Sequence, residues 1–99
     1  AQPGERFIYS TGTWHILGAA VSQACDMSLL EMTRRWIGDP MGLRIPAWVR
    51  DPQGYFLGGN DMAMRPADLA RIGTMVLAGG RFGDVRIVSE DWISRLCRV

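Results

Sequence analysis

Tyr9, Ser10 and Thr11 are three adjacent residues with hydroxyl groups, near the start of a 99-residue chain. A tyrosine phenol can take a proton from a poor nucleophile and later return one to a departing group, as acyl transfer requires. A free phenol has a pKa of about 10, so only about one molecule in a thousand is ionised at pH 7. Such a tyrosine therefore needs a nearby cation, most simply an ammonium group, to favour its anion.

That cation is not a lysine of this chain, because all eleven of its basic residues are arginine. They are spread from Arg6 to Arg98, and the net charge of +1 leaves no basic stripe for nucleic acid. Cys25 and Cys97 lie too far apart in sequence for a metal knuckle, and the single histidine, His15, cannot complete a zinc site. We therefore expect no structural metal and no nucleic-acid partner, while the pairing of the cysteines stays open.

The composition is that of an ordinary folded protein. Hydrophobic residues make up 47% of the chain and charged residues 21%, far from the balance of disordered segments. Ninety-nine residues suffice for one modest domain. No apolar run approaches the roughly eighteen residues of a membrane span. The compartment cannot be deduced from these features.

Apolar residues at helical spacing predict a first helix from about Thr13 to Cys25, with Trp14, Leu17 and Val21 on one face. Gly18 inside it indicates a close contact with another element. A capping box from Ser28 to Glu31 then predicts a second helix.

The second helix should run to about Ile37, because Gly38 and Pro40 are stop signals. From Pro40 to Asn60 the density of proline and glycine predicts an irregular excursion with short strands at most. Its Gly58-Gly59 pair would let backbone come close to a ligand, although a plain turn is the simpler interpretation.

Pro66 suits the first turn of a third helix, with Asp68 near its positive end and an ion pair to Arg71. Leu69, Ile72 and Val76 should form its buried face, and Gly79-Gly80 should end it.

Gly83-Asp84 reads as a turn before a short strand, Val85 to Val88. Ser89 then caps a final helix. The expected fold is mainly helical with short β segments, and residues 1–99 should form part of a single domain.

Four blocks in this order resemble the β-lactamase-related serine hydrolases, a family that includes class C β-lactamases, penicillin-binding-protein carboxypeptidases, esterases and 6-aminohexanoate-dimer hydrolases. The blocks are Pro3 to Thr11 with Ile16-Leu17-Gly18, then Pro40-Met41-Gly42-Leu43, then Gly58-Gly59 with Asp68 to Gly73, and finally Gly79-Gly80 through Ile87-Val88 to Trp92-Ile93. They lean toward the esterase and amide-hydrolase branch.

The resemblance implies an α/β fold of the β-lactamase and DD-peptidase type, of which this chain would be an internal piece truncated at both ends. It implies that Tyr9 is the catalytic tyrosine and that Thr11 faces the substrate, where the family has Asn or Ser. The substrate would be a small ester, linear amide or β-lactam, and the parent enzyme would need no metal or organic cofactor. The family's Ser-x-x-Lys and its Lys-Thr-Gly or His-x-Gly motifs are absent from these residues, so we expect the chain alone to be inactive.

Other interpretations stand beside this one. Tyr9 could be a buried aromatic that closes a loop, and His15 a surface or core filler, because no Ser-His-Asp triad is visible. Trp48 could belong to the core or line a substrate cleft. The chain could also be a non-catalytic binding homologue of the same fold, supported by Thr11, or a small helical interaction protein.

Overall fold

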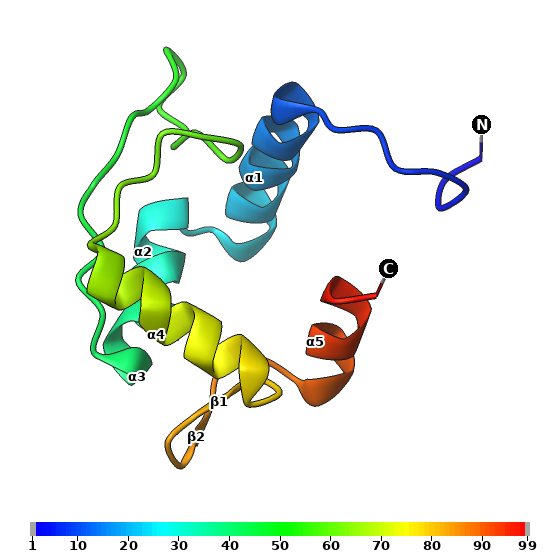
Figure 1. Ribbon diagram of the computed structural model, residues 1–99. Coiled ribbons are helices and arrows are strands. Elements are labelled where there is room, and N and C mark those ends of the chain that lie inside the picture. Colours follow the sequence, from blue (N-terminus) through cyan, green and yellow to red (C-terminus); the bar gives the residue numbers. More distant parts are fainter. Residues whose placement is uncertain (1, 99) are drawn as a thin grey trace. The chain divides into compact units, whose positions relative to one another are not determined.

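A computed structural model of the protein describes residues 2–98, which fall into two compact units. Figure 1 shows the helices and strands of these residues. The first unit consists of residues 2–29 and 48–62, and the second of residues 30–47 and 63–98. About half of the described residues are helical, and they contain a short two-stranded sheet. The expectation of a mainly helical protein with short β segments is confirmed. None of the helices within residues 2–98 has the length and apolar character to cross a membrane.

The first unit is built on helix α1 (Thr11–Cys25). The helix begins slightly earlier than predicted, because Ser10 is extended and its Oγ accepts a hydrogen bond from the backbone N–H of Thr13. This is a helix N-cap, which satisfies one of the free amides of the first turn. Gly18 is buried, and a Cβ there would lie 3.3 Å from Cα of Gly58. The predicted close contact is therefore present, and it brings a loop onto the helix.

The rest of the first unit is the hairpin segment, residues 48–62, which folds back on itself. Arg50 and Phe56 form an antiparallel bridge, and Leu57 N donates to Val49 O at 2.9 Å. Trp48 completes the closure, because its ring lies 5.0 Å from that of Phe56 and its Nε1 donates to Leu57 O. The excursion thus has only a minimal strand character, as predicted.

The second unit opens with α2 (Leu29–Thr33, whose first residue lies in the first unit), η1 (Arg34–Gly38) and α3 (Asp39–Met41). The predicted stop at Gly38 and Pro40 is wrong. Wider π-type turns form η1, where Asp39 N donates to Arg34 O, and Pro40 occupies the first turn of α3. Proline is tolerated there because that position needs no amide donor. Gly42, with φ +67°, ends the run.

Helix α4 (Pro66–Leu77) starts at the predicted proline and ends before Gly79 and Gly80, which both have positive φ. Its inner face differs from the predicted one at Leu69, while Ile72 and Val76 are half-buried. Asp68 and Met75 are buried, whereas Leu69 is 61% exposed. The apolar spacing pointed to Leu69, but the carboxylate of Asp68 takes the inner position because it has partners there.

A small hairpin and a helix complete the second unit. β1 (Arg81–Phe82) pairs antiparallel with β2 (Val85–Arg86), so the predicted strand is confirmed in its first half. Helix α5 (Glu90–Leu96) begins where predicted, with Ser89 Oγ accepting from Trp92 N at 3.1 Å. Six buried apolar side chains form the core of this unit: Met32, Met41, Leu43, Ile45, Met75 and Ile93.

Candidate functional site

Tyr9 lies in the extended stretch immediately before α1, and 76% of its surface is exposed. It is not a buried aromatic within the described chain. The next residue, Ser10, uses its Oγ to accept from the backbone N–H of Thr13, and this Oγ also lies 2.9 Å from Thr13 Oγ1. Thr11, the first residue of α1, is exposed. Ser10 therefore serves the helix start, while Tyr9 and Thr11 present their hydroxyl-bearing side chains at the surface.

The glycine pair of the hairpin segment packs against this same helix start. A Cβ at Gly59 would lie 2.5 Å from the carbonyl oxygen of Thr11, and one at Gly58 would lie 2.6 Å from that of Trp14. Both distances are too short for any other residue without a shift of the backbone. The pair is more than a plain turn, because it brings loop backbone against the first turns of α1 beside Thr11.

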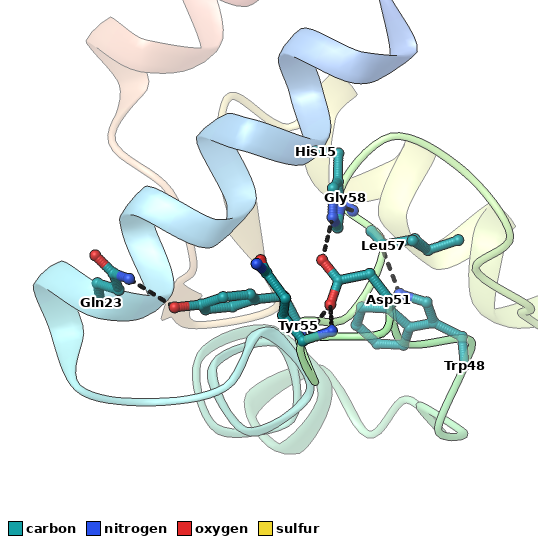
Figure 2. A network of polar contacts seen from close by, with 8 residues as sticks. His15, Gln23, Trp48, Asp51, Tyr55, Leu57 and Gly58 are labelled. Atoms are coloured by element: carbon teal, nitrogen blue, oxygen red, sulfur yellow. Dashed lines mark hydrogen bonds and ion pairs between the residues drawn. The ribbon is translucent and has the colours of Figure 1, made fainter.

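A polar network holds the hairpin segment on α1 (Figure 2). His15 Nε2 lies 2.7 Å from Asp51 Oδ2, and its Nδ1 accepts from the backbone N–H of Gly58 at 3.2 Å. Two turns further along the helix, Gln23 Nε2 donates to the hydroxyl of Tyr55 at 2.6 Å. His15 is therefore a link between helix and loop, and not a filler.

Asp51 is the centre of this network. Its Oδ1 accepts from the backbone N–H groups of Gln53 and Tyr55, both at 2.9 Å. The hydrogen bond from His15 holds the pKa of Asp51 below its usual value, and the two backbone donors add to this effect while burial opposes it. The side chain is therefore an acceptor-only carboxylate at neutral pH.

Neither His15 nor Asp51 was identified from the sequence as part of a site. The Asp51-Pro52-x-Gly54 pattern is a turn signal, and it could have predicted the Asp51 cap of the hairpin. The contact with His15 could not have been predicted, because it joins positions 36 residues apart.

Asp68 forms a second carboxylate centre, within the second unit. It is fully buried and accepts from Arg65 Nε at 3.0 Å, from the backbone N–H of Arg44 at 3.2 Å and from Arg71 Nη1 at 3.4 Å. The hydrogen bond from Arg65 lowers the pKa of Asp68, opposed by burial. The predicted ion pair with Arg71 is present, but Arg65 makes the closer one. These contacts tie α4 to the segment after Gly42, so Asp68 has a structural role.

The second unit also contains a half-open hollow of about 280 Å³ lined by Arg44, Pro46, Ala63, Met64 and Arg65. None of the residues predicted to do chemistry lines it. Within residues 2–98, no three His, Cys, Asp or Glu side chains are grouped to hold a metal ion. Cys25 and Cys97 are exposed free thiols.

Trp48 belongs to the hairpin closure described above and is half-buried there. The candidate site is thus the start of α1. It consists of Tyr9, Thr11 and the Gly58-Gly59 backbone, which is bonded to His15 and, through His15, to Asp51. In comparisons with known proteins, no family model matches the chain, and no curated protein matches it.

Proposed function

We propose that the chain is a segment of a β-lactamase-related serine hydrolase in which Tyr9 exchanges protons during acyl transfer. The observation that carries the proposal is the arrangement at the start of α1. An exposed phenol precedes a capped helix start, and the backbone of Gly58 and Gly59 closes on that helix start beside Thr11. Tyr9, Thr11 and the Gly58-Gly59 pair all lie in the four sequence blocks that resemble the family. His15 and Asp51, which hold the glycine pair on the helix, lie outside those blocks.

In the proposed reaction, the serine hydroxyl of a Ser-x-x-Lys motif attacks the carbonyl carbon of an ester, linear amide or β-lactam. The Tyr9 phenolate takes the hydroxyl proton, and a lysine ammonium favours that phenolate. The bond from the carbonyl carbon to the leaving oxygen or nitrogen then breaks, and Tyr9 returns the proton to the leaving atom. Water releases the acyl group by the same exchanges in reverse.

Thr11 has the role of substrate recognition in this proposal. Its hydroxyl can both donate and accept hydrogen bonds, as Asn or Ser would at this position. It is shorter than Asn and branched, so it departs from the residues that the family has there. A binding protein of the same fold without turnover is the second candidate, and the threonine is the observation that favours it.

The 99-residue chain has no lysine and no Ser-x-x-Lys motif, so we expect it to hydrolyse neither nitrocefin nor p-nitrophenyl butyrate above background. Turnover that co-purifies with the chain and disappears in Tyr9→Phe would contradict this mechanism.

The decisive test uses the whole protein encoded by the reading frame that contains these residues. We expect Ser-x-x-Lys upstream, and we expect mass spectrometry after a rapid acid quench to find substrate acyl mass on that serine. An intact protein that binds substrate but has no Ser-x-x-Lys motif, or never becomes acylated, would favour the binding homologue and overturn the hydrolase.

A further inference from the structure

Three observations meet on one face of α1. Thr11 and His15 are four residues apart, so they lie one above the other on the helix. Gly59 packs on Thr11, and a Cβ on Gly58 would lie 3.2 Å from Cα of His15. The backbone of Gly58 and Gly59 therefore follows the face that carries Thr11, and His15 is the side chain of that face that bonds to it.

The hydrogen bonds fix where the proton of His15 resides. Asp51 is a carboxylate that only accepts, so Nε2 of the imidazole must carry the hydrogen that it shares with Oδ2. The backbone N–H of Gly58 only donates, so Nδ1 must be bare to accept it. The two contacts together require the neutral imidazole with its hydrogen on Nε2.

We propose that His15 is a positioning residue, which holds the Gly58-Gly59 backbone beside Thr11 only in this neutral form, and that Asp51 selects the form. Protonation of Nδ1 would place a donor against the Gly58 N–H and expel it, while the contact with Asp51 would persist as an ion pair. Acid would thus release the glycine pair without separating His15 from Asp51. Any effect of this release on substrate binding rests on the proposed function, because only there does Thr11 recognise the substrate.

Other ionisable groups do not compete for the imidazole in the described contacts. Between its ends at Thr11 and Cys25, α1 contains no charged side chain other than His15 when protonated. On residues 48–62 the guanidinium of Arg50 lies over the Phe56 ring, 5.5 Å from its centroid, and the Tyr55 hydroxyl is bonded to Gln23. Asp61 lies beyond the glycine pair, in the left-handed region with φ +66°. Asp51 is the one whose contact with His15 is observed.

The test uses the 99-residue chain labelled with ¹⁵N. A long-range ¹H–¹⁵N spectrum of the imidazole at neutral pH should show Nε2 protonated and Nδ1 bare. On acidification, the amide resonance of Gly58 should titrate together with the His15 ring. The protection of the Gly58 amide, measured as its exchange rate relative to the intrinsic rate at each pH, should fall by about two- to twelve-fold, the effect of losing one ordinary hydrogen bond. A ring with its hydrogen on Nδ1, or a Gly58 amide that ignores the titration, would overturn the proposal.

Asp51→Asn provides a sharper variant. The Asn oxygen can still accept from the amides of Gln53 and Tyr55, which fixes the side-chain NH₂ toward His15. An NH₂ group only donates there, so the ring hydrogen should move to Nδ1 and the Gly58 amide should lose protection, while those of Gln53 and Tyr55 keep it. Unchanged tautomer and unchanged Gly58 protection would contradict the selecting role of Asp51.

Two substitutions of His15 separate positioning from general packing. His15→Asn retains an acceptor near the position of Nδ1, so the Gly58 amide should stay protected and lose its pH dependence. His15→Phe keeps a ring but no acceptor, so protection should fall at every pH. Equal protection in both variants would overturn the proposal. These readouts require no activity, so a failure of the hydrolase proposal would leave them unchanged, and their failure would leave the chemistry of Tyr9 open to its own test.

Discussion

The first unit holds its hairpin segment on α1 through polar contacts centred on Asp51, whereas the second unit contains six buried apolar side chains and the fully buried Asp68. Both carboxylates accept hydrogen bonds from backbone N–H groups and from side chains. They differ in those side chains, because Asp68 has arginines, which stay charged at all ordinary pH values, and Asp51 has a histidine.

This difference indicates which part of the chain should be more stable and which part should change more readily. Because the second unit has a buried core and permanent charges, we expect it to resist unfolding more than the first unit. The first unit has half-buried contacts that depend on a proton, and it contains the candidate site. Regions that bind and act are commonly drawn from the less stable parts of a protein.

The largest effect is expected from Asp68→Ala, which would remove the common acceptor of Arg65, Arg71 and the backbone N–H of Arg44. A buried donor without a partner is costly. We expect the thermal midpoint to fall by about 10 °C or more, a large shift for a chain of this size. The matched control is Asp91→Ala, whose ion pair with Arg95 is exposed and worth about 0.5 kcal/mol or less. Equal melting of both variants by circular dichroism would remove the contrast between the units.

A smaller loss is expected from Gly59→Ala in the first unit, because the new Cβ would meet the carbonyl oxygen of Thr11 at 2.5 Å. Displacing this backbone should cost about 1–3 kcal/mol in the free energy of unfolding by urea. Gly73→Ala is the control, since its Cβ meets nothing within 4 Å in the middle of α4 and should stabilise by about 0.5–1 kcal/mol. A neutral Gly59→Ala would show that the hairpin segment does not depend on its close approach to α1.

Much of the secondary structure could be predicted from local signals. The end of α4 at Gly79, the start of α5 at Ser89 and the turn between the strands depend on residues that act over three or four positions. These signals are read correctly because capping and turn formation are local effects. The predicted start of α1 at Thr13 lies two residues after the observed one, because Ser10 is the N-cap.

The remaining features depend on contacts between distant residues. Apolar spacing placed Leu69 on the inner face of α4, but the partners of Asp68 turn that carboxylate inward. The helical run continues past the chain breakers Gly38 and Pro40, because the wider turns of η1 lead directly into α3, which ends at Met41. Tyr9 and Thr11 could be proposed from the sequence because they lie in a block that resembles a known family. The contacts of His15 with Asp51 and Gly58 could not, because they join positions far apart in the chain.

Acid should also affect the two units differently, but the expected difference in stability is smaller. The pKa values of Asp51 and Asp68 are both lowered by folding, so each contributes stability above the unfolded value of about 3.9 and loses it as the pH falls through the folded value. At pH values above those at which Asp51 and Asp68 are protonated, only the first unit should lose stability, because protonation of His15 removes the acceptor of the Gly58 N–H. That loss should be about 0.5–1.5 kcal/mol locally.

Amide hydrogen exchange between pH 7 and pH 5, corrected for intrinsic rates, measures this response. The Gly58 amide should lose protection over that range, and the amides of α4 should not. Loss of protection in α4 over the same range would show that the second unit contains the more acid-sensitive contacts, opposite to the expected order.

The proposed role of Tyr9 is tested most directly by its replacement in the whole protein. Tyr9→Phe should lower kcat/KM for an ester substrate by about 10²–10⁴-fold, the usual contribution of a positioned proton-transfer group, without loss of folding. Tyr55→Phe is the matched control, because that hydroxyl only accepts from Gln23, and it should retain kcat/KM within about three-fold, the scale expected when one exposed neutral hydrogen bond is lost. A Tyr9→Phe enzyme as active as the Tyr55→Phe enzyme would contradict the assignment of Tyr9 as the proton-exchanging residue.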